Sequence, residues 1–523
     1  MSPPSFEAAW NDGFLNPITK EILVSHGFPV DEIPTYLSLP LGGRLKHCAN
    51  NWAKIGASQW VFNVITEGYK IPFERPPAQR IVPENPKAEG EAFNILNSEA
   101  EELLRKTAIS LSGNETGEYI SSYFAVAKAR SPGKFRPILN LKKFNKNIRK
   151  YKFKMESLRH VRDWLKEGAY CISIDLKDAF LHVSMHKRFT KFLKFKWLGI
   201  LYNWTSLPFG LRCSPRVLTK VLKPVMAFLR SKFNILVSIY LDDMLVQASS
   251  KEKALLHGKI VALVLMLLGW SINWTKSSFV PQQKVVHLGF ELDTVSMLVT
   301  CPRAKVEDLQ ALSRKALDDS SITAHDCERL LGKMESVRPA TKLAALYYRP
   351  IQKQLLSLKR TWGEGERFPS QMISLSSNSL KCLEWWVSAS GFEVSCSSPI
   401  RELPSSLDIW TDANLEMCGA HNSRGEFYQR LWTPEELELD MHINQLEIRA
   451  AREGLINLAS RGDRVRLFVD STAALFYIKN KEGHAVTHWR EKLFLCGKIQ
   501  SQMVLICSHL NGFRLPIISV LTF

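Results

Sequence analysis

Short apolar runs divided by polar turns characterise the first part of this chain. CISIDL (171–176) and FLKFKW (192–197) are each typical of a strand, and SIYLDDMLVQ (238–247) predicts two strands that meet at adjacent aspartates. Helical spacing of apolar residues covers residues 91–112, 216–233 and 253–270. Strands mixed with helices in this order predict an α+β domain.

The second half of the chain divides at a serine-rich patch. Before the patch, residues 303–360 have a helical and basic pattern. After it, LDIWT, EMCGAHN and EFYQRLW predict three strands, which a helix at 442–460 and a strand at RVRLFV follow. We expect this last block to be an α/β domain of its own.

The start of the chain has the weakest pattern. We expect residues 1–90 to be irregular, with a linker marked by prolines at 72, 76, 77, 83 and 86. The expected parts are an N-terminal extension and linker (1–90), a first domain (91–300), basic helices (301–365), a second linker (366–405) and a last domain (406–523).

The overall charge indicates a class of partner. Of 523 residues, 69 are Lys or Arg and 51 are Asp or Glu, a formal net charge of +18. This surplus favours a polyanionic partner, nucleic acid before membrane, although a basic and soluble surface is the simpler alternative. With 45% hydrophobic residues, the chain can still bury large cores.

Cysteine spacing and apolar run lengths indicate the compartment. Ten cysteines are scattered without a CxxC pair, which favours a reducing environment over a disulfide framework or a zinc site. The longest apolar run, Ile260–Trp270, is too short to cross a bilayer and is better explained as a buried helix. No signal peptide is evident at the N-terminus. We therefore expect an intracellular, soluble protein of the cytoplasm, the nucleus or both.

Residues 128–154 are the most basic stretch. They contain eleven Lys or Arg and no Asp or Glu, interleaved with aromatic residues. A solvated face is one explanation. The alternation of apolar and basic positions also predicts strands that present charge on one side, where a phosphate backbone could bind.

Adjacent carboxylates at Asp242 and Asp243 require an explanation. Turns favour Asp, but neither residue is followed by the Gly that favours a tight two-residue hairpin. Neighbouring carboxylates repel, and each raises the pKa of the other unless a cation lies between them. The pair therefore predicts half of a metal site.

A third carboxylate is needed for two-metal nucleotidyl transfer, in which ions about 3.5–4 Å apart are held by residues from separate elements. Asp175, at the end of the strand in CISIDLKDAF, is the candidate. Taken alone, Asp175 is equally well explained as a helix N-cap.

Six motifs in chain order carry a family resemblance: KFRPILNL, SIDLKDAF, LPFGLRCSPRVLTK, YLDD, GWSINWTKS and HLGFEL, over residues 134–292. They resemble the successive motifs of reverse transcriptases of long-terminal-repeat and related retroelements. The resemblance implies a right-hand polymerase with fingers, palm and thumb. It implies that Asp175, Asp242 and Asp243 hold two Mg²⁺, or Mn²⁺, for RNA-directed DNA synthesis on an RNA or DNA template-primer with dNTPs.

Further roles follow from the same resemblance. Lys128 and Arg136 match residues that grip the triphosphate, with a generic basic surface as the alternative. Phe180 matches the aromatic ring that excludes a 2′-hydroxyl and so selects deoxynucleotides, with core packing as the alternative. Phe209 marks the non-retroviral form of LPFGL, and Gly210 lets the backbone approach the nascent base pair.

The motifs nearest the thumb complete the polymerase. Lys276 is a candidate proton donor to the leaving pyrophosphate. HLGFEL resembles the primer grip, and residues 303–360 resemble the thumb.

The last block resembles retroelement ribonuclease H, which uses two metals and four carboxylates. Asp412 in IWTDAN, Glu447 after HINQL and Asp470 in RLFVD match three of the four, with caps or surface charges as the alternative. No Asp or Glu follows Glu491, so we expect an incomplete, C-terminally truncated or frame-shifted domain whose activity is open. His509 matches the histidine that accompanies the fourth carboxylate.

The segment LGGRLKHCANNWAKIGASQWVF, the LPFGL form and the direct passage from thumb to ribonuclease H most resemble DIRS-type retrotransposons; a gypsy-like origin is the alternative. The resemblance covers residues 41–510. No Asp-Thr-Gly or Asp-Ser-Gly protease signature is present, in agreement with the DIRS type. An element-encoded recombinase or integrase is an expected partner.

Two other functions compete with polymerase activity. A non-catalytic nucleic-acid-binding remnant of a decayed element would bind with a steep salt dependence but extend no primer. A free-standing nuclease built on the last block is the weakest alternative, because the missing carboxylate falls there.

Overall fold

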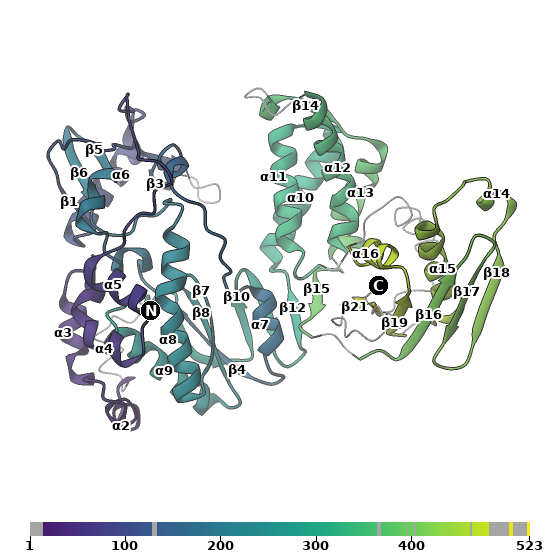
Figure 1. Cartoon of the computed structure of the whole chain (residues 1–523), viewed down its shortest axis with the longest axis horizontal. Helices are drawn as coiled ribbons and strands as arrows, with labels where there is room; N and C mark the ends of the chain where they lie inside the picture. The colour runs from purple at the N-terminus through teal and green to yellow at the C-terminus, as the bar shows by residue number, and fades with distance from the viewer. Residues whose placement is uncertain are drawn as a thin grey trace. The chain divides into compact units, whose positions relative to one another are not determined.

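The fold of the chain is known from a computed structural model (Figure 1). The chain forms two compact units, Met1–Leu288 (unit 1) and Gly289–Phe523 (unit 2). The structure describes residues 14–127, 133–341, 343–362, 368–393, 395–401, 404–460, 463–480, 502–505 and 520–522.

A four-stranded antiparallel sheet lies at the centre of unit 1, in the order β7, β8, β4, β9. Helix α9 packs on β4 and β8, and α8 packs on β7. Every residue of α9 from Ile260 to Leu267 is buried, which confirms that the long apolar run is a core helix. The bounds are β4 Tyr170–Asp175, β7 Leu236–Tyr240, β8 Asp243–Ala248, β9 Ser278–Gln282, α8 Ser214–Phe233 and α9 Lys251–Leu267.

Smaller elements complete the chain between residues 90 and 288. Strands β1, β6 and β5 form one sheet, and β2 and β3 form a hairpin within the basic stretch. Lys194 is completely buried in β5, where its ammonium group lies 2.9 Å from Glu115 and 2.8 Å from Glu118. The bounds are α6 Gly90–Arg105, β1 Ile109–Leu111, β2 Tyr123–Ala127, β3 Phe135–Leu139, η4 Phe144–Asn147, α7 Leu158–Trp164, η5 Ala179–His182, η6 Lys187–Phe192, β5 Lys194–Trp197, β6 Ile200–Trp204 and β10 Lys284–His287.

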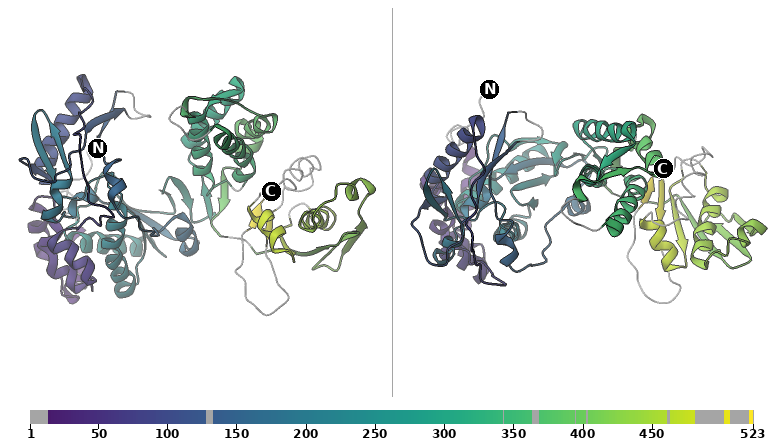
Figure 2. Two further views of the ribbon diagram at one scale, coloured as in Figure 1. Left: turned by 45° about the horizontal axis from the view of Figure 1, so that its top comes forward. Right: turned by 90° about the horizontal axis from the view of Figure 1, so that it is seen from above.

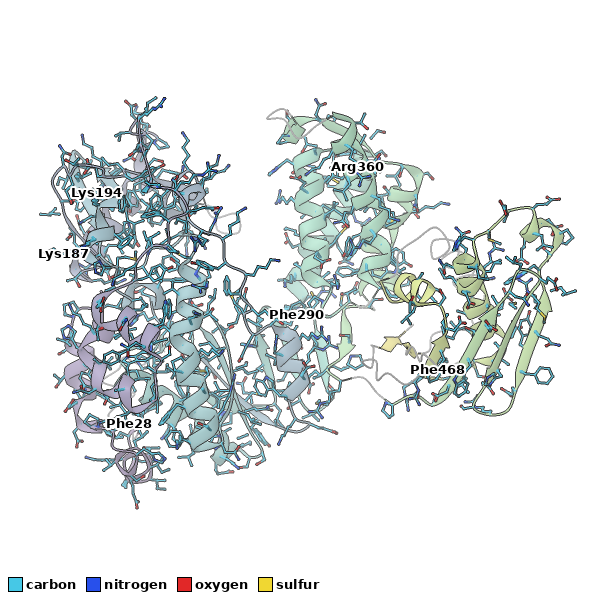
Figure 3. The ribbon with its side chains drawn as sticks, viewed as in Figure 1. Phe28, Lys187, Lys194, Phe290, Arg360 and Phe468 are labelled. Atoms are coloured by element: carbon cyan, nitrogen blue, oxygen red, sulfur yellow. The ribbon has the colours of Figure 1, made fainter. Side chains whose placement is uncertain are left out.

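The N-terminal segment is helical, so the expectation of irregular structure is wrong for residues 17–67, whereas residues 68–89 belong to no helix or strand, as expected for a linker. Figure 2 shows these purple helices against the teal elements of unit 1. Phe28, labelled in Figure 3, packs edge-on against Phe228 of α8 at 5.7 Å between ring centroids. The bounds are α2 Pro17–Ser25, η2 Val30–Glu32, α3 Ile33–Ser38, η3 Arg44–Cys48, α4 Ala49–Lys54 and α5 Gln59–Glu67.

Two side chains of α4 attach this segment to the end of α9. Asn51 donates to the Leu267 carbonyl at 2.8 Å, and the Trp52 indole donates to the Leu268 carbonyl at 3.0 Å. The next residue, Gly269, has a φ of +90°, and a Cβ there would lie 3.2 Å from the Cys48 sulfur. The chain reverses at this glycine because a side chain would be strained and crowded.

The proline-rich linker lies along the smaller sheets. Gln79 donates to and accepts from the backbone of Ile120 at 2.7 and 2.8 Å. Asn85 accepts from the Tyr123 amide at 2.7 Å and donates to the Lys196 carbonyl at 2.6 Å. The side-chain amides of Gln79 and Asn85 thus form hydrogen bonds with backbone groups that the strands leave unpaired.

Unit 2 begins with a helical subdomain in which the predicted second linker is folded. Helix α13 packs on α10 and α12. Trp386 is completely buried, and Trp385 stacks on Tyr347 at 4.0 Å between ring centroids. The expectation of a linker at 366–405 is therefore wrong for this helix. The bounds are β11 Phe290–Asp293, β12 Leu298–Thr300, α10 Arg303–Asp319, β13 Ser321–Thr323, α11 Ala324–Val337, α12 Ala344–Trp362, η7 Phe368–Ser370, β14 Met372–Ser374, α13 Ser377–Val387, η8 Ala389–Glu393 and β15 Ser397–Pro399.

The last part of unit 2 is a mixed sheet in the order β18, β17, β16, β19, β20, β21, on which α15 packs. Strands β16 and β19 are parallel neighbours. This is the predicted α/β block. The bounds are β16 Leu407–Ala413, β17 Met417–Asn422, β18 Phe427–Leu431, α14 Pro434–Leu437, α15 Ile443–Leu458, β19 Val465–Val469, α16 Thr472–Asn480, β20 Gln502–Leu505 and β21 Val520–Thr522.

The cysteines and the helices bear on the expectations of a reducing environment and of no membrane-spanning segment. Their eight cysteines are all buried free thiols. No helix in the described ranges has the length and apolar character needed to span a membrane.

Replacing Trp52 with alanine should destabilise unit 1 by about 3–5 kcal/mol, because the change removes a fully buried ring and its hydrogen bond to Leu268. Chemical denaturation followed by circular dichroism measures this loss. Ile81→Ala, at a residue that is 84% exposed, is the control and should change stability by less than about 0.5 kcal/mol. Equal stability of the two variants would contradict the packing described for the N-terminal segment.

Candidate active sites

Two predicted carboxylates face each other in the sheet of unit 1. Asp175, the last residue of β4, is the register partner of Asp243, the first residue of β8. Like charges directly opposite each other on antiparallel strands are destabilising. Strand pairing therefore fixes the position of Asp243 opposite Asp175, and the preference of turns for Asp does not by itself explain this residue.

The hairpin between β7 and β8 is a tight two-residue turn. Tyr240 pairs with Asp243, which leaves Leu241 and Asp242 as the turn residues. Leu241 has a φ of +57°, a left-handed conformation that costs a residue with a side chain about 1–2 kcal/mol. The sequence argument against a tight turn, which relied on the missing Gly, is therefore wrong. The Asp242 carbonyl accepts the Leu176 amide at 3.0 Å, which ties the turn to the end of β4.

The backbone of Asp175 is held on both sides. Its amide donates to the Ser277 hydroxyl at 3.0 Å, and its carbonyl accepts the Asn273 amide at 2.8 Å. The Lys276 ammonium lies 3.8 Å from Asp175 Oδ2. Asp175 Oδ1 is buried and has no hydrogen-bond partner among the described residues. An unpartnered carboxylate oxygen beside two other carboxylates fits a divalent cation, which prefers oxygen ligands.

Burial and repulsion from the neighbouring carboxylates both raise the pKa of the Asp175 carboxyl group. The pKa of Asp175 is raised, first by burial and then by Asp242 and Asp243, while Lys276 opposes the rise. Burial likewise raises the pKa of Asp242. The ionised forms of Asp175 and Asp242 are therefore disfavoured unless positive charge is supplied.

One residue near the site was missed by the sequence analysis. His287, at the start of HLGFEL, is 1% exposed, and its Nδ1 lies 3.3 Å from Asp243 Oδ2. The motif was noticed, but the spacing to YLDD gives no sign that this side chain turns toward the carboxylates.

The structure brings Phe180 and Phe209 together. Their rings meet edge-on at 4.8 Å between centroids, with Phe180 9% exposed and Phe209 56% exposed. Gly210 has a φ of +81°, and a Cβ there would meet no described atom closer than 3.7 Å. Backbone conformation alone therefore explains this glycine.

Arg136 is exposed on β3, and Lys128 lies outside the described residues, so the roles of these two remain predictions.

A second set of carboxylates meets in the last part of unit 2. Asp412 lies near the end of β16, and Asp470 directly follows β19, its parallel neighbour, so both lie at the same sheet edge. Glu447 is supplied by α15. Ligand oxygens of the three residues all lie within 4.8 Å of one another. The structure therefore assembles three residues that lie far apart along the chain.

Glu447 is the buried member of this cluster. It is 4% exposed, and burial, followed by Asp470 and Asp412, raises its pKa to about 8. Its Oε2 has no hydrogen-bond partner in the described part of the chain. These features fit a metal ligand.

Within the described residues, Asp412, Glu447 and Asp470 are the one set of three possible metal ligands so closely spaced. Asp175, Asp242 and Asp243 do not meet this spacing. Glu491 and His509 lie outside the described residues.

Comparison with known families concerns the part of the chain that contains the paired aspartates. Residues 126–292 match the family described as reverse transcriptase (RNA-dependent DNA polymerase). This chain contains a reverse transcriptase domain. The matched range includes Asp175, Asp242, Asp243 and nearly coincides with the six motifs at 134–292.

Relatives of this reverse transcriptase domain are retroviral polyproteins. The chain is 22% identical over 302 residues to the Gag-Pol polyprotein of bovine immunodeficiency virus, covering 56% of the chain and 18% of the relative. It is 26% identical over 217 residues to the Pro-Pol polyprotein of simian foamy virus type 3, covering 42% and 18%. The chain thus spans about a fifth of the length of these relatives.

Solved structures agree with the reverse transcriptase fold. A foamy viral protease-reverse transcriptase in complex with dsDNA has a TM-score of 0.50 at 17% identity, covering 85% of this chain and 89% of the other. The same protein in complex with RNA/DNA hybrid also has a TM-score of 0.50 at 17% identity, covering 92% and 63%. These similarities and the mixed helix and strand content confirm the expected fold class, a reverse transcriptase-like polymerase fold.

Metal binding at the second cluster should strengthen as the pH rises to about 8 and level off above it. Glu447 retains a proton up to that pH and must lose it to become a ligand. Calorimetric titration with Mn²⁺ in buffers of different ionisation enthalpy measures the released proton. The titration uses chains carrying Asp242→Asn and Asp243→Asn, which removes the first site. Adding Glu447→Gln should abolish the proton release; unchanged release would contradict the assignment.

Proposed function

We propose that the reverse transcriptase domain is an active RNA-directed DNA polymerase that adds dNTPs to a primer 3′ end on an RNA or DNA template. The observation that carries this proposal is the register pairing of Asp175 with Asp243, with Asp242 in the adjoining turn. In the reaction, the primer 3′-oxygen forms a bond to the α-phosphorus, and the bond to pyrophosphate breaks. Two Mg²⁺, or Mn²⁺, held by the three carboxylates would activate the 3′-hydroxyl and neutralise charge on the triphosphate.

Side chains around the carboxylates support distinct steps. Lys276 is 65% exposed and close to Asp175, so its ammonium group can give a proton to the departing pyrophosphate. Phe180 packs against Phe209, and we assign its ring to exclusion of a 2′-hydroxyl. Arg136 and Lys128 are assigned to the triphosphate.

A second activity, hydrolysis of the RNA strand of a hybrid, is favoured by the close approach of Asp412, Glu447 and Asp470. Three carboxylates within 4.8 Å can hold one divalent ion well. A second ion needs a further ligand, so we expect this activity to be weaker than polymerase activity.

We assign the chain to a DIRS-type retrotransposon, with a gypsy-like element as the alternative. The support is the N-terminal segment, whose Asn51 and Trp52 attach to α9, together with Phe209 in LPFGL. Under this assignment the template, the primer and an element-encoded recombinase are the partners.

Asp242→Asn with Asp243→Asn should lower primer extension by at least about 10²-fold, because both changes remove negative charge that the reaction requires. Extension of a labelled primer on an oligoribonucleotide template with Mg²⁺ or Mn²⁺ measures this. Asp163→Asn, at an exposed position on α7, is the matched control and should extend normally. If all three chains bind template-primer but none extends it, the chain is a non-catalytic remnant and the proposal is wrong.

Phe180→Val should reduce the preference for dNTPs over ribonucleotides by about 10- to 100-fold, because a smaller side chain leaves room for the 2′-hydroxyl. Single-nucleotide incorporation rates for dCTP and CTP give the ratio. Phe180→Tyr keeps the ring and should keep the preference. A preference unaltered by Phe180→Val would assign Phe180 to core packing.

A further inference from the structure

A groove on unit 1 lies outside the polymerase site. Its volume is about 600 Å³, and two segments line it, residues 70–77 and residues 186–192. We call it the basic aromatic groove. Figure 3 labels Lys187, the first residue of η6, whose helix forms one side of the groove. None of the lining residues is a polymerase carboxylate or one of the side chains that contact them.

Three half-buried phenylalanines form the apolar part of the groove. Phe73 is stacked on Phe189, with ring centroids 6.0 Å apart and planes 26° apart. Phe192 meets Phe73 edge-on at 5.1 Å. Each ring keeps part of its surface open to solvent. Such rings can stack with the bases of an unpaired strand, because every base has a π-face.

The charged part of the groove is basic. Arg75 and Arg188 are exposed, and neither guanidinium makes an ion pair or hydrogen bond with any residue in the described ranges. The Lys191 ammonium lies 5.3 Å from the Phe192 ring centroid and 3.0 Å from the Thr116 carbonyl, and it forms no ion pair with a carboxylate in the described ranges. Glu74 is the one carboxylate among the lining residues. Two free guanidinium groups beside aromatic rings are suited to phosphates.

The two sides of the groove are fixed to each other by backbone hydrogen bonds. The Tyr69 amide donates to the Ser184 carbonyl at 2.8 Å, and the His186 amide donates to the Tyr69 carbonyl at 3.0 Å. Gly68 has a φ of +91°, and a Cβ there would lie 2.6 Å from the His186 nitrogen. The groove is therefore preformed, which lowers the entropy cost of binding.

Further hydrogen bonds connect the groove to the LPFGL loop. The Glu74 amide donates to the carbonyl of Asn147, the last residue of η4, at 2.8 Å. The Asn145 side chain, in the same short helix, donates to the Gly210 carbonyl at 2.8 Å. A nucleic-acid strand bound in the groove would therefore be separated only by η4 from the LPFGL loop, which is assigned to the nascent base pair.

We propose that the basic aromatic groove binds single-stranded nucleic acid, with bases stacked on the phenylalanines and phosphates bound by Arg75 and Arg188. Duplex nucleic acid does not fit this chemistry, because its base faces are already stacked. An apolar peptide would leave both guanidinium groups without a partner. This site is additional to the polymerase function and needs no metal ion.

Binding of a fluorescent 12-nucleotide oligo(U) to the full chain tests the proposal. The titration is done in EDTA on chains carrying Asp242→Asn and Asp243→Asn, so its result is independent of polymerase activity. Adding Arg75→Gln and Arg188→Gln should lower the affinity at least tenfold and reduce the slope of log affinity against log salt by about 1.4, for two phosphate contacts. Arg159→Gln with Lys232→Gln removes two exposed charges elsewhere on unit 1 and should change the affinity less than twofold.

The stacking part is tested separately. Phe189→Ala should lower the affinity about fivefold or more with no change in the salt slope. Circular dichroism establishes that this variant is folded; Phe189→Leu is used if it is not. An oligo(U) carrying 4-thiouridine should crosslink to peptides that contain Phe73 or Phe189.

Three results would overturn the proposal. The first is equal affinity of the groove variant and the charge-matched control. The second is crosslinking confined to peptides outside residues 70–77 and 186–192. The third is competition by polyglutamate as effective as competition by unlabelled oligo(U), since polyglutamate supplies negative charge without bases.

Discussion

The pairing of β4 with β8 is the constraint on which the proposed polymerase site depends. It places Asp175 opposite Asp243, an arrangement that costs free energy in the absence of a cation. The cost is tolerated because apolar packing around α9 fixes the sheet regardless of these charges. A stable core thus holds together carboxylates that repel each other, which is how folds commonly position catalytic groups.

The N-terminal segment supports the end of β4 through a series of hydrogen bonds. Arg44 donates to the Ser271 hydroxyl at 2.7 Å, and the Ser271 amide donates to His182 Nε2 at 3.0 Å. Burial lowers the pKa of His182 to about 3, so the ring stays neutral and can accept this hydrogen bond. The Ser271 carbonyl in turn accepts the Lys177 amide at 2.9 Å, two residues beyond Asp175. The segment is therefore part of the support for β4.

The sequence predicted the features that repeat along the chain and missed those that depend on contacts between distant residues. Apolar runs identified β4, α8 and α9 because burial imposes a period on the residues. The left-handed Leu241 could not be predicted, because pairing of the flanking strands imposes it against local preference. Helix α4 was missed because its stability comes from contacts between distant residues, such as the hydrogen bond from Trp52 to Leu268. Adjacency singled out Asp242 and Asp243, the end of a strand suggested Asp175, and the family motifs joined the three. The proximity of His287 came from the fold alone.

X-ray diffraction at the manganese absorption edge tests the central claim most directly. The crystals would contain the chain, a template-primer, a non-hydrolysable dNTP and Mn²⁺. We expect two anomalous peaks about 3.5–4 Å apart, bound by Asp175, Asp242 and Asp243. Absence of manganese between Asp175 and Asp243 at a saturating concentration would contradict it.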